Sequence, residues 1–386
     1  MKELIHILKA RTAHPNQPFA LATVVRVEGG CRHAGARMLI DIDGHTVGSI
    51  GGGSVQNDVI AKGLEVLVSR ENRLMSYDVL SPAGAASDAT VSGRETVDVL
   101  IEALLPENAW SLEPILDQIL HDGSPLVLGT LHGKGETGLT LAHSFLENDE
   151  EVLINFLNPD ERRHLKRQMR EVAETGKSQS LCYGDSAHFV ELFLEKVVPP
   201  PELFIFGTGE DVRPLVQLAH DVGYRVTIVD HREEEVDPLR FLEADAVLHV
   251  KPHHILEQLA FTPRSAAIIM NHCHETDCEL LGILLPLKIA YLGMVGPKKK
   301  TKKILQELEQ NRFSFSPQNL EKLHAPAGLD IGSESPEELA LSILAEIQAA
   351  LSAQRSASLR EHVVPIAPEP FLPRIRKKSA MLQAEA

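Results

Sequence analysis

Leu203-Phe204-Ile205-Phe206-Gly207-Thr208-Gly209-Glu210-Asp211-Val212 is the stretch that decides the fold of the C-terminal half of the chain. Its four apolar residues predict a short buried strand, and the glycines that follow predict a tight turn into a helix. Gly207 would permit the sharp reversal, and Gly209 would let the backbone approach a pyrophosphate closely. The start of the helix then offers free N–H groups and the positive end of its dipole. Val212 stands where a third small residue is usual, so the glycine fingerprint is incomplete.

An acidic residue at the end of the next predicted strand strengthens the prediction of a dinucleotide-binding fold. Residues 225–229 are typical of a strand, and Asp230 follows them, 23 residues after Gly207. A carboxylate at that place accepts hydrogen bonds from an adenosine ribose. Glu210 and Asp211 add negative charge near the expected phosphate, which counts against tight phosphate binding. A Rossmann scaffold without a bound dinucleotide is therefore the alternative, because a fold does not determine a function.

Short apolar strands alternate with helical stretches up to about residue 353. This alternation predicts an α/β fold with a Rossmann-like, doubly wound parallel sheet that helices cover on both faces. The predicted strands are Leu203–Phe206, Arg225–Asp230, Ala246–Val250, Ala266–Met270 and Ile289–Met294.

The run Pro199-Pro200-Pro201 marks the clearest domain boundary, because consecutive prolines cannot continue a helix or a central strand. We therefore predict an N-terminal domain over residues 1–198, a Rossmann-like domain over residues 199–354 and a tail over residues 355–386. The tail contains the basic run Arg374-Ile375-Arg376-Lys377-Lys378. Its composition is typical of a segment that is partly disordered or docked on a partner.

Strand and helix patterns mix in the N-terminal domain, which predicts a mixed α/β fold. Asp43-Gly44 is a strong hairpin signal, and apolar residues recur at helical spacing after Ser54. The predicted strands cover residues 19–27, 38–43, 46–50, 95–104, 125–132 and 188–197, and a charged helix covers residues 159–174.

Composition excludes several classes of protein. The 43% of hydrophobic and 24% of charged residues are normal for a soluble globular chain. Four cysteines without the spacing of a disulfide framework indicate a reducing compartment, and no apolar segment suits a signal peptide or a membrane span, so we expect a cytoplasmic protein. A net charge of −16 argues against non-specific nucleic-acid binding. Small anionic ligands are not excluded, since a few local cations and helix ends suffice to bind them.

A second glycine-rich segment, Gly51-Gly52-Gly53-Ser54, precedes a predicted helix. Ser54 is expected to be the N-cap, and the glycines would let backbone amides face an anion. An ordinary capped turn is the alternative, although three successive glycines carry an entropic cost that such a turn does not require. Gly51, Gly52, Gly53 and Ser54 are therefore expected to bind a cofactor.

A lysine-rich segment follows the last predicted central strand. Five lysines crowd residues 298–303, at the start of a predicted helix, where positive charge is unfavourable in isolation. The segment therefore indicates a bound phosphate or an acidic partner surface, and Gly296 and Lys298 are expected cofactor contacts. A solvated lysine face is the alternative.

The segment Asn271–Cys278 lies at the carboxyl end of a predicted strand, where ligands of open parallel sheets bind. His272 and Asp277 are its expected catalytic or ligand-contact residues, and capping of the next helix is the alternative. The segment contains two histidines and two cysteines, but no second pair stands at zinc-site spacing, so no metal site is predicted. Cys31 is a further catalytic candidate, because the basic residues around it would favour its thiolate; an incidental cysteine is the alternative.

Together these motifs resemble the xanthine dehydrogenase accessory protein family (XdhC/CoxI type), over nearly the whole chain to about residue 350. In the N-terminal half, the likeness is carried by Ala20–Val25, Gly29-Gly30, Gly35–Leu39 and Gly48–Gly53. In the C-terminal half, it is carried by Phe206–Gly209, Val229-Asp230, Asn271-His272, Tyr291–Gly293, Gly296 with its lysines, His324–Gly332 and Ser335–Ala340.

The resemblance implies an N-terminal XdhC/CoxI domain joined to a Rossmann domain. It also implies a homodimeric accessory protein, a chaperone of the molybdenum cofactor (molybdopterin) without turnover of its own. Such a protein would bind and protect the cofactor, support its sulfuration and help to insert it into its partner, a xanthine-dehydrogenase-type molybdenum hydroxylase. Glycine loops and helix N-termini suit the terminal phosphate of that cofactor.

The chain departs from the family pattern in its N-terminal half. The family usually carries a cysteine where Ser54 stands and an acid where Gln56 stands. Its Cys-Gly-Gly is also missing, and that region reads Val91-Ser92-Gly93-Arg94. A serine oxygen is a harder ligand than a thiolate and is poorly suited to sulfur or molybdenum chemistry.

Two other functions are compatible with the same residues. The first is an NAD(P)-dependent oxidoreductase, in which Gly207, Gly209 and Asp230 hold the dinucleotide and His272 exchanges a proton. Asp230 favours NAD, since a carboxylate repels the 2′-phosphate of NADP, whereas Arg232 weakens that preference. The second is a non-catalytic regulator that uses an inherited fold, which the missing family cysteines favour.

Overall fold

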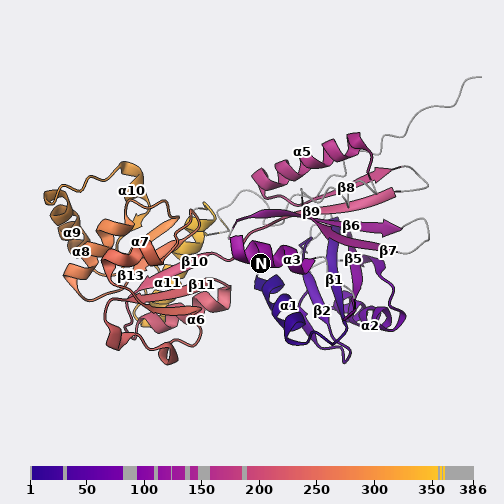
Figure 1. The fold of residues 1–386 in the computed structure, drawn as a ribbon, viewed down its shortest axis with the longest axis horizontal. Helices are drawn as coiled ribbons and strands as arrows, with labels where there is room; N and C mark the ends of the chain where they lie inside the picture. The colour runs from indigo at the N-terminus through magenta and orange to yellow at the C-terminus, as the bar shows by residue number, and fades with distance from the viewer. Residues whose placement is uncertain are drawn as a thin grey trace, which may run out of the picture. The chain divides into compact units, whose positions relative to one another are not determined.

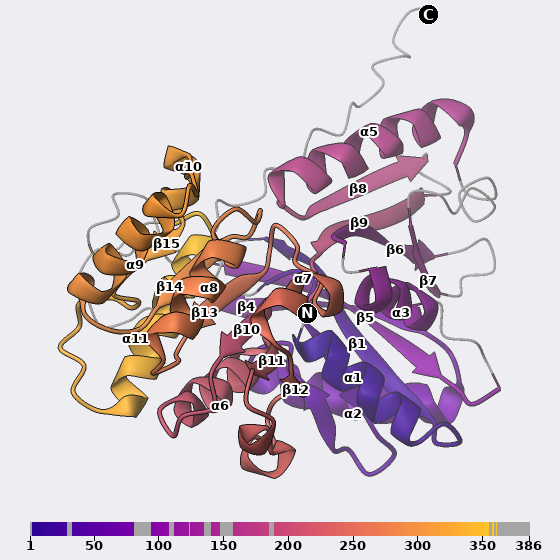
Figure 2. The ribbon, with the colours of Figure 1, turned by 60° about the vertical axis from the view of Figure 1, so that its left-hand side comes forward.

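A computed structural model describes residues 2–28, 33–80, 94–107, 112–122, 124–134, 140–146, 157–184, 189–354, 357–358 and 360. The chain divides into two compact units, one over Glu3–Pro199 and one that begins at Pro200. Figures 1 and 2 show the elements of each unit from two directions.

The N-terminal unit is built on two antiparallel sheets. Within the described residues, the first has the strand order β3-β2-β1-β5-β4, in which the long strands β1 and β5 pair over most of their lengths. Helix α2 covers one face of this sheet, where Val55, Val59 and Val66 pack on buried strand residues. The elements are α1 (Lys2–Ala13), β1 (Phe19–Glu28), β2 (Arg37–Ile40), β3 (Thr46–Gly48), α2 (Ser54–Ser69), β4 (Arg73–Leu80), β5 (Arg94–Leu104) and α3 (Leu112–Asp122).

The second sheet of this unit has the strand order β7-β6-β9-β8. Helix α5 covers one face of it (Figure 2) through Leu165, Met169 and Val172. The helix starts at a capping box, in which the Asn158 side chain accepts from the amide of Glu161 and the Glu161 side chain from the amide of Asn158. The elements are β6 (Leu126–Lys134), β7 (Thr140–Phe145), α5 (Pro159–Thr175), β8 (Gln179–Gly184) and β9 (Phe189–Val197).

The two sheets meet through a partly polar layer. Phe193 of β9 packs on Val25 and Leu100 of the first sheet. Beside this apolar contact, Arg37 of β2 is buried and forms an ion pair with Glu195 of β9. The layer therefore holds charged side chains where a packed interior normally holds apolar ones.

The C-terminal unit has a parallel sheet with the order β12-β11-β10-β13-β14-β15. The chain starts in the middle, moves outward to β12 and then crosses to the other side at β13, which is the order of a doubly wound Rossmann fold. The elements are β10 (Glu202–Phe206), α6 (Val212–Val222), β11 (Arg225–Asp230), β12 (Ala246–His249), α7 (Ile255–Gln258), β13 (Ala266–Ile269), α8 (His274–Leu284), β14 (Tyr291–Met294), α9 (Lys298–Gln310), α10 (Pro317–Glu321), β15 (Leu323–His324) and α11 (Pro336–Leu351), with 3-10 turns at Glu233–Glu235, Pro238–Arg240 and Pro252–His254.

Helices cover both faces of this sheet. Helices α6 and α11 pack together on one face, and α7, α8 and α9 pack on the other. Alternate strand residues point to the two faces, so Leu203 and Ile205 face the first set, and Phe204 and Phe206 face the second. The predicted fold class, a mixed α/β N-terminal part and a Rossmann-like sheet, is confirmed.

One predicted detail of the N-terminal unit is wrong. Ser54 is the first residue of α2, and the N-cap is Gly53, with φ 85° and ψ −156°. L-residues rarely adopt this conformation, so the chain enters the helix through a backbone state that glycine supplies at little cost. Among the described residues, no helix is long and apolar enough to cross a membrane.

Candidate functional site

The glycine turn lies at the carboxyl end of β10, between its neighbours β11 and β13. Gly207 has φ +129°, and a Cβ there would lie 2.7 Å from the carbonyl oxygen of Met270. Only glycine fits, because both the backbone angle and the space exclude a side chain. The chain crosses between β10 and β13 at this point, which is where open α/β sheets bind their ligands.

Helix α6 follows this turn without a side-chain cap. Its N-cap, Asp211, makes no capping hydrogen bond, and its first turn contains no acidic residue. The Val212 amide donates to the carbonyl oxygen of Gly209 at 3.1 Å and Pro214 has no N–H, which leaves the amides of Asp211 and Arg213 at this end for an anion. Glu210 is exposed and ion-paired to Arg240 at 3.0 Å, which offsets its charge beside the helix start.

Asp230 ends β11 as predicted, but its carboxylate is engaged within the protein. Oδ1 accepts from the backbone N and from Nε of Arg232, both at 3.0 Å. Oδ2 accepts from Thr208 Oγ1 at 2.7 Å and from Arg232 Nη2 at 2.9 Å. Burial alone would raise the pKa of Asp230, but these hydrogen bonds outweigh it and hold the pKa below its ordinary value.

Arg240 is a site residue that the sequence analysis missed. It lies in a 3-10 turn after β11, and its Nη2 donates to the carbonyl oxygen of Thr208 at 2.9 Å. It also forms ion pairs with Glu210 and, at 3.3 Å, with Glu235. No motif in the sequence identifies such a residue, because its position depends on how the loop after β11 folds back over the glycine turn.

Polar residues gather at the carboxyl end of β13. Asn271 is buried, and its Oδ1 has no hydrogen-bond partner among the described residues. His272 lies beside the glycine turn, with Nε2 3.6 Å from the position that a Cβ at Gly209 would take. The structure thus places His272 beside the glycine turn, close enough for both to contact one bound molecule.

Asp277 and Lys300 form an ion pair in the same region. The Asp277 side chain is fully buried, that of Lys300 is 22% exposed, and Lys300 Nζ also lies 3.4 Å from the carbonyl oxygen of Asn271. Burial raises the pKa of Asp277, and the Lys300 ammonium limits that rise. Asp277 Oδ1 has no hydrogen-bond partner among the described residues.

The structure places the predicted contact Lys298 and its neighbour Lys300 differently. Lys298 is the first residue of α9 and is exposed. Lys300 instead turns inward, over Gly296, where a Cβ would lie 3.3 Å from Lys300 Cδ. Gly296 has φ +125°, so it is needed for the backbone before α9 as well as for the path of Lys300.

Cys273 is a second site residue that the sequence analysis did not single out. It is the N-cap of α8 and is exposed. Hydrogen bonds from Thr276, first from its side chain and then from its amide, lower the pKa of the Cys273 thiol. Cys31, the predicted reactive cysteine, lies outside the described residues, as does the basic run of the tail.

The glycine loop of the N-terminal unit is open. Gly51 and Gly53 have φ +101° and +85°, whereas Gly52 has no positive φ. A Cβ at Gly52 or Gly53 would meet no atom within 4 Å. A side chain would therefore fit at position 52, where neither the space nor the backbone angle requires glycine.

We expect Gly52→Ala to change the free energy of unfolding by less than about 1 kcal/mol, because neither space nor backbone angle excludes a side chain there. Gly53→Ala is expected to cost about 1–2 kcal/mol, because alanine is strained at positive φ. Urea unfolding of both variants measures the difference. An equal loss of free energy of unfolding in the two variants would contradict the different roles of Gly52 and Gly53.

Asp41, Asp43 and His45 offer ligand atoms within 4.8 Å of one another at the β2–β3 hairpin. Asp41 Oδ1 accepts from the amides of Asp43 and His45, and its Oδ2 lies 3.1 Å from His45 Nδ1. These bonds stabilise the turn itself, and the cluster supports no metal proposal.

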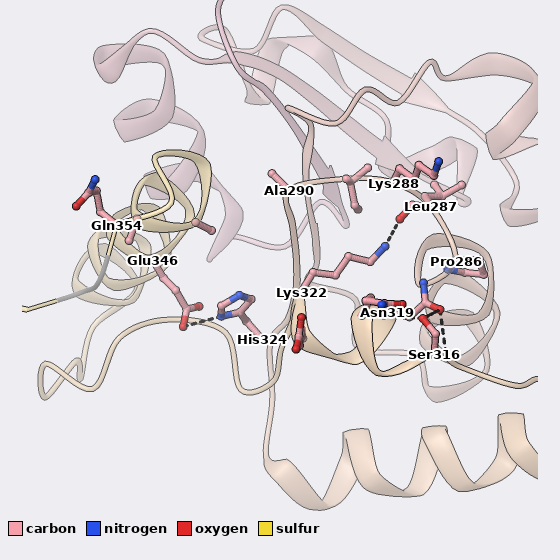
Figure 3. A pocket seen from close by; sticks show the side chains of 15 residues that line it. Pro286, Leu287, Lys288, Ala290, Ser316, Asn319, Lys322, His324, Glu346 and Gln354 are labelled. Atoms are coloured by element: carbon pink, nitrogen blue, oxygen red, sulfur yellow. Dashed lines mark hydrogen bonds and ion pairs between the residues drawn. The ribbon is translucent and has the colours of Figure 1, made fainter. Parts of the chain in front are cut away.

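A separate pocket of about 690 Å³ lies at the amino-terminal ends of β14 and β15. Figure 3 shows His324 facing Glu346, and Lys322 reaching toward the carbonyl of Leu287. His324 Nδ1 lies 3.0 Å from Glu346 Oε1, and Oε2 accepts from Tyr291 Oη and from the amide of Gly328, both at 2.8 Å. Glu346 thus fastens the His324–Gly332 motif to α11, which is a structural role.

Comparison with known proteins agrees with this architecture. Residues 13–78 match the XdhC and CoxI family, and residues 203–347 match the XdhC Rossmann domain, together more than half of the chain. The chain is 27% identical to a probable xanthine dehydrogenase subunit of Bacillus subtilis, over 85% of this chain and 91% of that protein. It is 24% identical to the uncharacterized protein YqeB of Escherichia coli, over 88% of this chain and 44% of that protein.

A solved structure shares the fold. The crystal structure of a xanthine dehydrogenase from Bacillus halodurans matches with a TM-score of 0.67 and 27% identity, over 93% of this chain and 98% of that one. From these matches and the Rossmann strand order, we conclude that the chain belongs to the XdhC and CoxI family.

Proposed function

We propose that this protein is an accessory factor of a xanthine-dehydrogenase-type molybdenum hydroxylase, which binds the molybdenum cofactor, shields it and helps to insert it into that partner. The names of the relatives suggest the association with xanthine dehydrogenase. Binding of the cofactor is our inference from the site, and the protein acts as a carrier, in which the cofactor is cargo.

The observation that carries the proposal is the unpartnered oxygen of Asn271 at the carboxyl end of β13. A buried amide oxygen without a donor is costly, and a pterin offers ring N–H and amino groups that can donate to it. Asp277 Oδ1 supplies a second buried acceptor in the same region. The phosphate of the cofactor would lie at the start of α6, which has no side-chain cap, and Lys300 supplies a cation at the neighbouring strand ends.

Within the N-terminal unit, the open glycine loop is a separate candidate anion site. Gly51, Gly52 and Gly53 precede α2, whose start has no side-chain cap and no acidic residue in its first turn. Ser54 offers a hydroxyl where a thiolate would bind a soft metal more tightly. We therefore assign retention of the cargo to its phosphate and pterin contacts, and Ser54→Cys is the change expected to tighten retention.

An NAD(P)-dependent oxidoreductase is the second candidate, since the strand order and the place of His272 suit one. It has less support, because the Asp230 carboxylate that would bind the ribose already accepts hydrogen bonds from Thr208 and Arg232.

Anaerobic calorimetric titration of the protein with molybdenum cofactor, NAD and NADP tests the proposal. We expect saturable binding of the cofactor alone. Asn271→Leu should weaken it about tenfold, which corresponds to the loss of one or two hydrogen bonds. The matched control is Asn311→Leu, a change of the same kind at an exposed residue after α9.

Binding of a nucleotide without binding of the cofactor would overturn the carrier proposal and favour the oxidoreductase. Equal cofactor affinity in Asn271→Leu and in the wild type would remove Asn271 from the site. Sedimentation of the protein alone and with cofactor-free xanthine dehydrogenase tests the proposed homodimer and the proposed partner.

A further inference from the structure

The side of the glycine turn that adjoins β11 is closed by an ion-pair network. Arg232 binds Asp230 through three hydrogen bonds and lies 3.7 Å from Glu235. Arg240 binds Glu235, Glu210 and the carbonyl oxygen of Thr208. In a dinucleotide-binding Rossmann fold, this is the side that receives the adenosine half.

The Asp230 carboxylate has no capacity left for a ribose. An ionised carboxylate has about four acceptor positions, and four hydrogen bonds from Thr208 and Arg232 occupy them. A ribose diol could bind Asp230 only after the Arg232 side chain had left. Asp230 thus positions Arg232, although its place in the sequence is that of a ribose-binding acid.

Charge makes departure of the arginines unfavourable. Arg232 and Arg240 each contact two carboxylates, and three carboxylates (Asp230, Glu235 and Glu210) surround the two cations. Removing a guanidinium would leave Asp230 buried, with its side chain 0% exposed and one partner fewer. With Arg213 paired to Glu210, three arginines balance the three carboxylates, so the charge of these arginines is already neutralised within the protein.

The opposite side holds one ion pair beside polar side chains. Lys300, ion-paired to Asp277, and the polar residues Asn271 and His272 lie at the ends of β13 and β14. The start of α6 is shared by both sides. A phosphorylated ligand would therefore be held over β10, β13 and β14.

We infer that the site takes a phosphorylated ligand without an adenosine half, and that Arg232 is the residue that excludes adenine dinucleotides. The inference rests on the proposed function, because it specifies the class of ligand for the same site. It separates the pterin monophosphate form of the cargo from NAD and NADP, and it explains why a ribose-binding acid is present in a site that does not bind a ribose.

Calorimetric titration with ADP-ribose tests the inference, since this probe carries the adenosine half and no nicotinamide. The wild type is expected to show no binding at millimolar concentrations, and Arg232→Ala is expected to bind at least ten times more tightly. Asp230→Asn in the Arg232→Ala background should abolish that gain, because the acceptor for the ribose is lost. Arg213→Ala is the control, since Arg213 is exposed and contacts only Glu210 of this network, at 3.4 Å.

Submillimolar binding of ADP-ribose to the wild type would overturn the inference, as would an Arg232→Ala protein that folds and gains no affinity. If Arg232→Ala does not fold, Arg232→Gln replaces it in the test, because glutamine keeps a polar side chain at this position. Titration of the wild type with molybdenum cofactor is measured separately. Failure of that titration would reject the proposed function, whereas failure of the ADP-ribose gain would reject only the role of Arg232.

Discussion

Lys300→Met is expected to lower the free energy of unfolding of the Rossmann-like unit by about 2–3 kcal/mol, because it leaves the buried Asp277 carboxylate without its cation. Breaking a fully buried ion pair in this way costs about 3–5 kcal/mol. We expect a smaller loss here, since Lys300 is 22% exposed and water can replace part of its contact. The methionine retains most of the aliphatic stem, so lost packing adds little.

The loss should depend on pH in a defined direction. Burial already raises the pKa of Asp277 above its ordinary value, and removal of Lys300 would raise it further. An acid whose folded pKa is raised destabilises the protein once it ionises, so stability falls as pH rises through that pKa. The variant should therefore lose most stability at pH 8 and least at about pH 4, where Asp277 is protonated.

Urea unfolding, with hydrogen exchange of the peptides around α8 and β13 as the readout, measures this effect. Lys302→Met is the matched control, because Lys302 belongs to the same helix and is exposed, and its loss should stay within about 0.5 kcal/mol. Asp277→Asn added to Lys300→Met should recover most of the stability. A loss that is the same at pH 4 and pH 8 would show that Asp277 is not the cause.

Most of the fold of the Rossmann-like unit could be predicted, because five of the six described strands are short apolar runs between strong breaks; β15, only two residues long, was not predicted. Leu203–Phe206 precedes two glycines, and Ala266–Ile269 lies between a serine and the polar segment at Asn271. Buried parallel strands need apolar side chains on both faces, so the pattern is plain in the sequence. Ile289 was included in the last of these strands, although that strand begins at Tyr291.

The N-terminal unit was harder to predict because its signals are weaker. Helices α1 and α3 and strands β4, β7 and β8 were not predicted. In β4, Met75, Tyr77 and Val79 alternate with polar residues and pack on the core, so period-two alternation would have identified that strand. Helix α1 mixes apolar with charged residues, and only its packing in one core with β1 and β2 reveals its role.

The sequence predicts which backbone segments lie at the candidate site, but not how their side chains pair. Sequence order places Gly207, Asp230 and His272 at strand ends, and a parallel sheet brings strand ends together. It cannot show that Arg232 binds Asp230, that Arg240 folds over the turn, or that Lys300 rather than Lys298 turns inward. Those contacts depend on rotamers and loop paths, which have no periodic signature.

Glu102→Gln is expected to stabilise the N-terminal unit at alkaline pH by about 3 kcal/mol, because it removes a buried charge between the two sheets. Glu102 is 8% exposed, and burial raises its pKa from 4.5 to about 7, although Arg37 opposes the rise. Each pKa unit corresponds to about 1.4 kcal/mol. Glutamine keeps the size and polarity of the side chain, and Arg37 keeps its ion pair with Glu195.

The direction in which stability changes with pH follows from proton binding. Between pH 4.5 and about 7, the folded protein holds a proton on Glu102 that the unfolded chain has lost, so stability falls as pH rises through this window. His132 acts in the opposite direction, because burial, with a contribution from Arg26, lowers its pKa from 6.5 to about 4. The folded protein then lacks a proton that the unfolded chain binds, and stability rises with pH between those values.

The two slopes offset each other in the wild type between about pH 4.5 and 6.5, so its stability should change little there on account of these groups. Glu102→Gln removes the pH dependence that comes from Glu102 and leaves the one that comes from His132. The free energy of unfolding of the variant should therefore rise steadily from pH 4 to pH 6.5. Urea unfolding across this range, with hydrogen exchange of β1 and β5 peptides, measures both effects. Glu71→Gln, a change of the same kind at an exposed residue, should follow the wild type at every pH. If Glu102→Gln also followed the wild type at every pH, the Glu102 carboxyl group would already be hydrated between the sheets. The polar layer would then not destabilise this unit at alkaline pH.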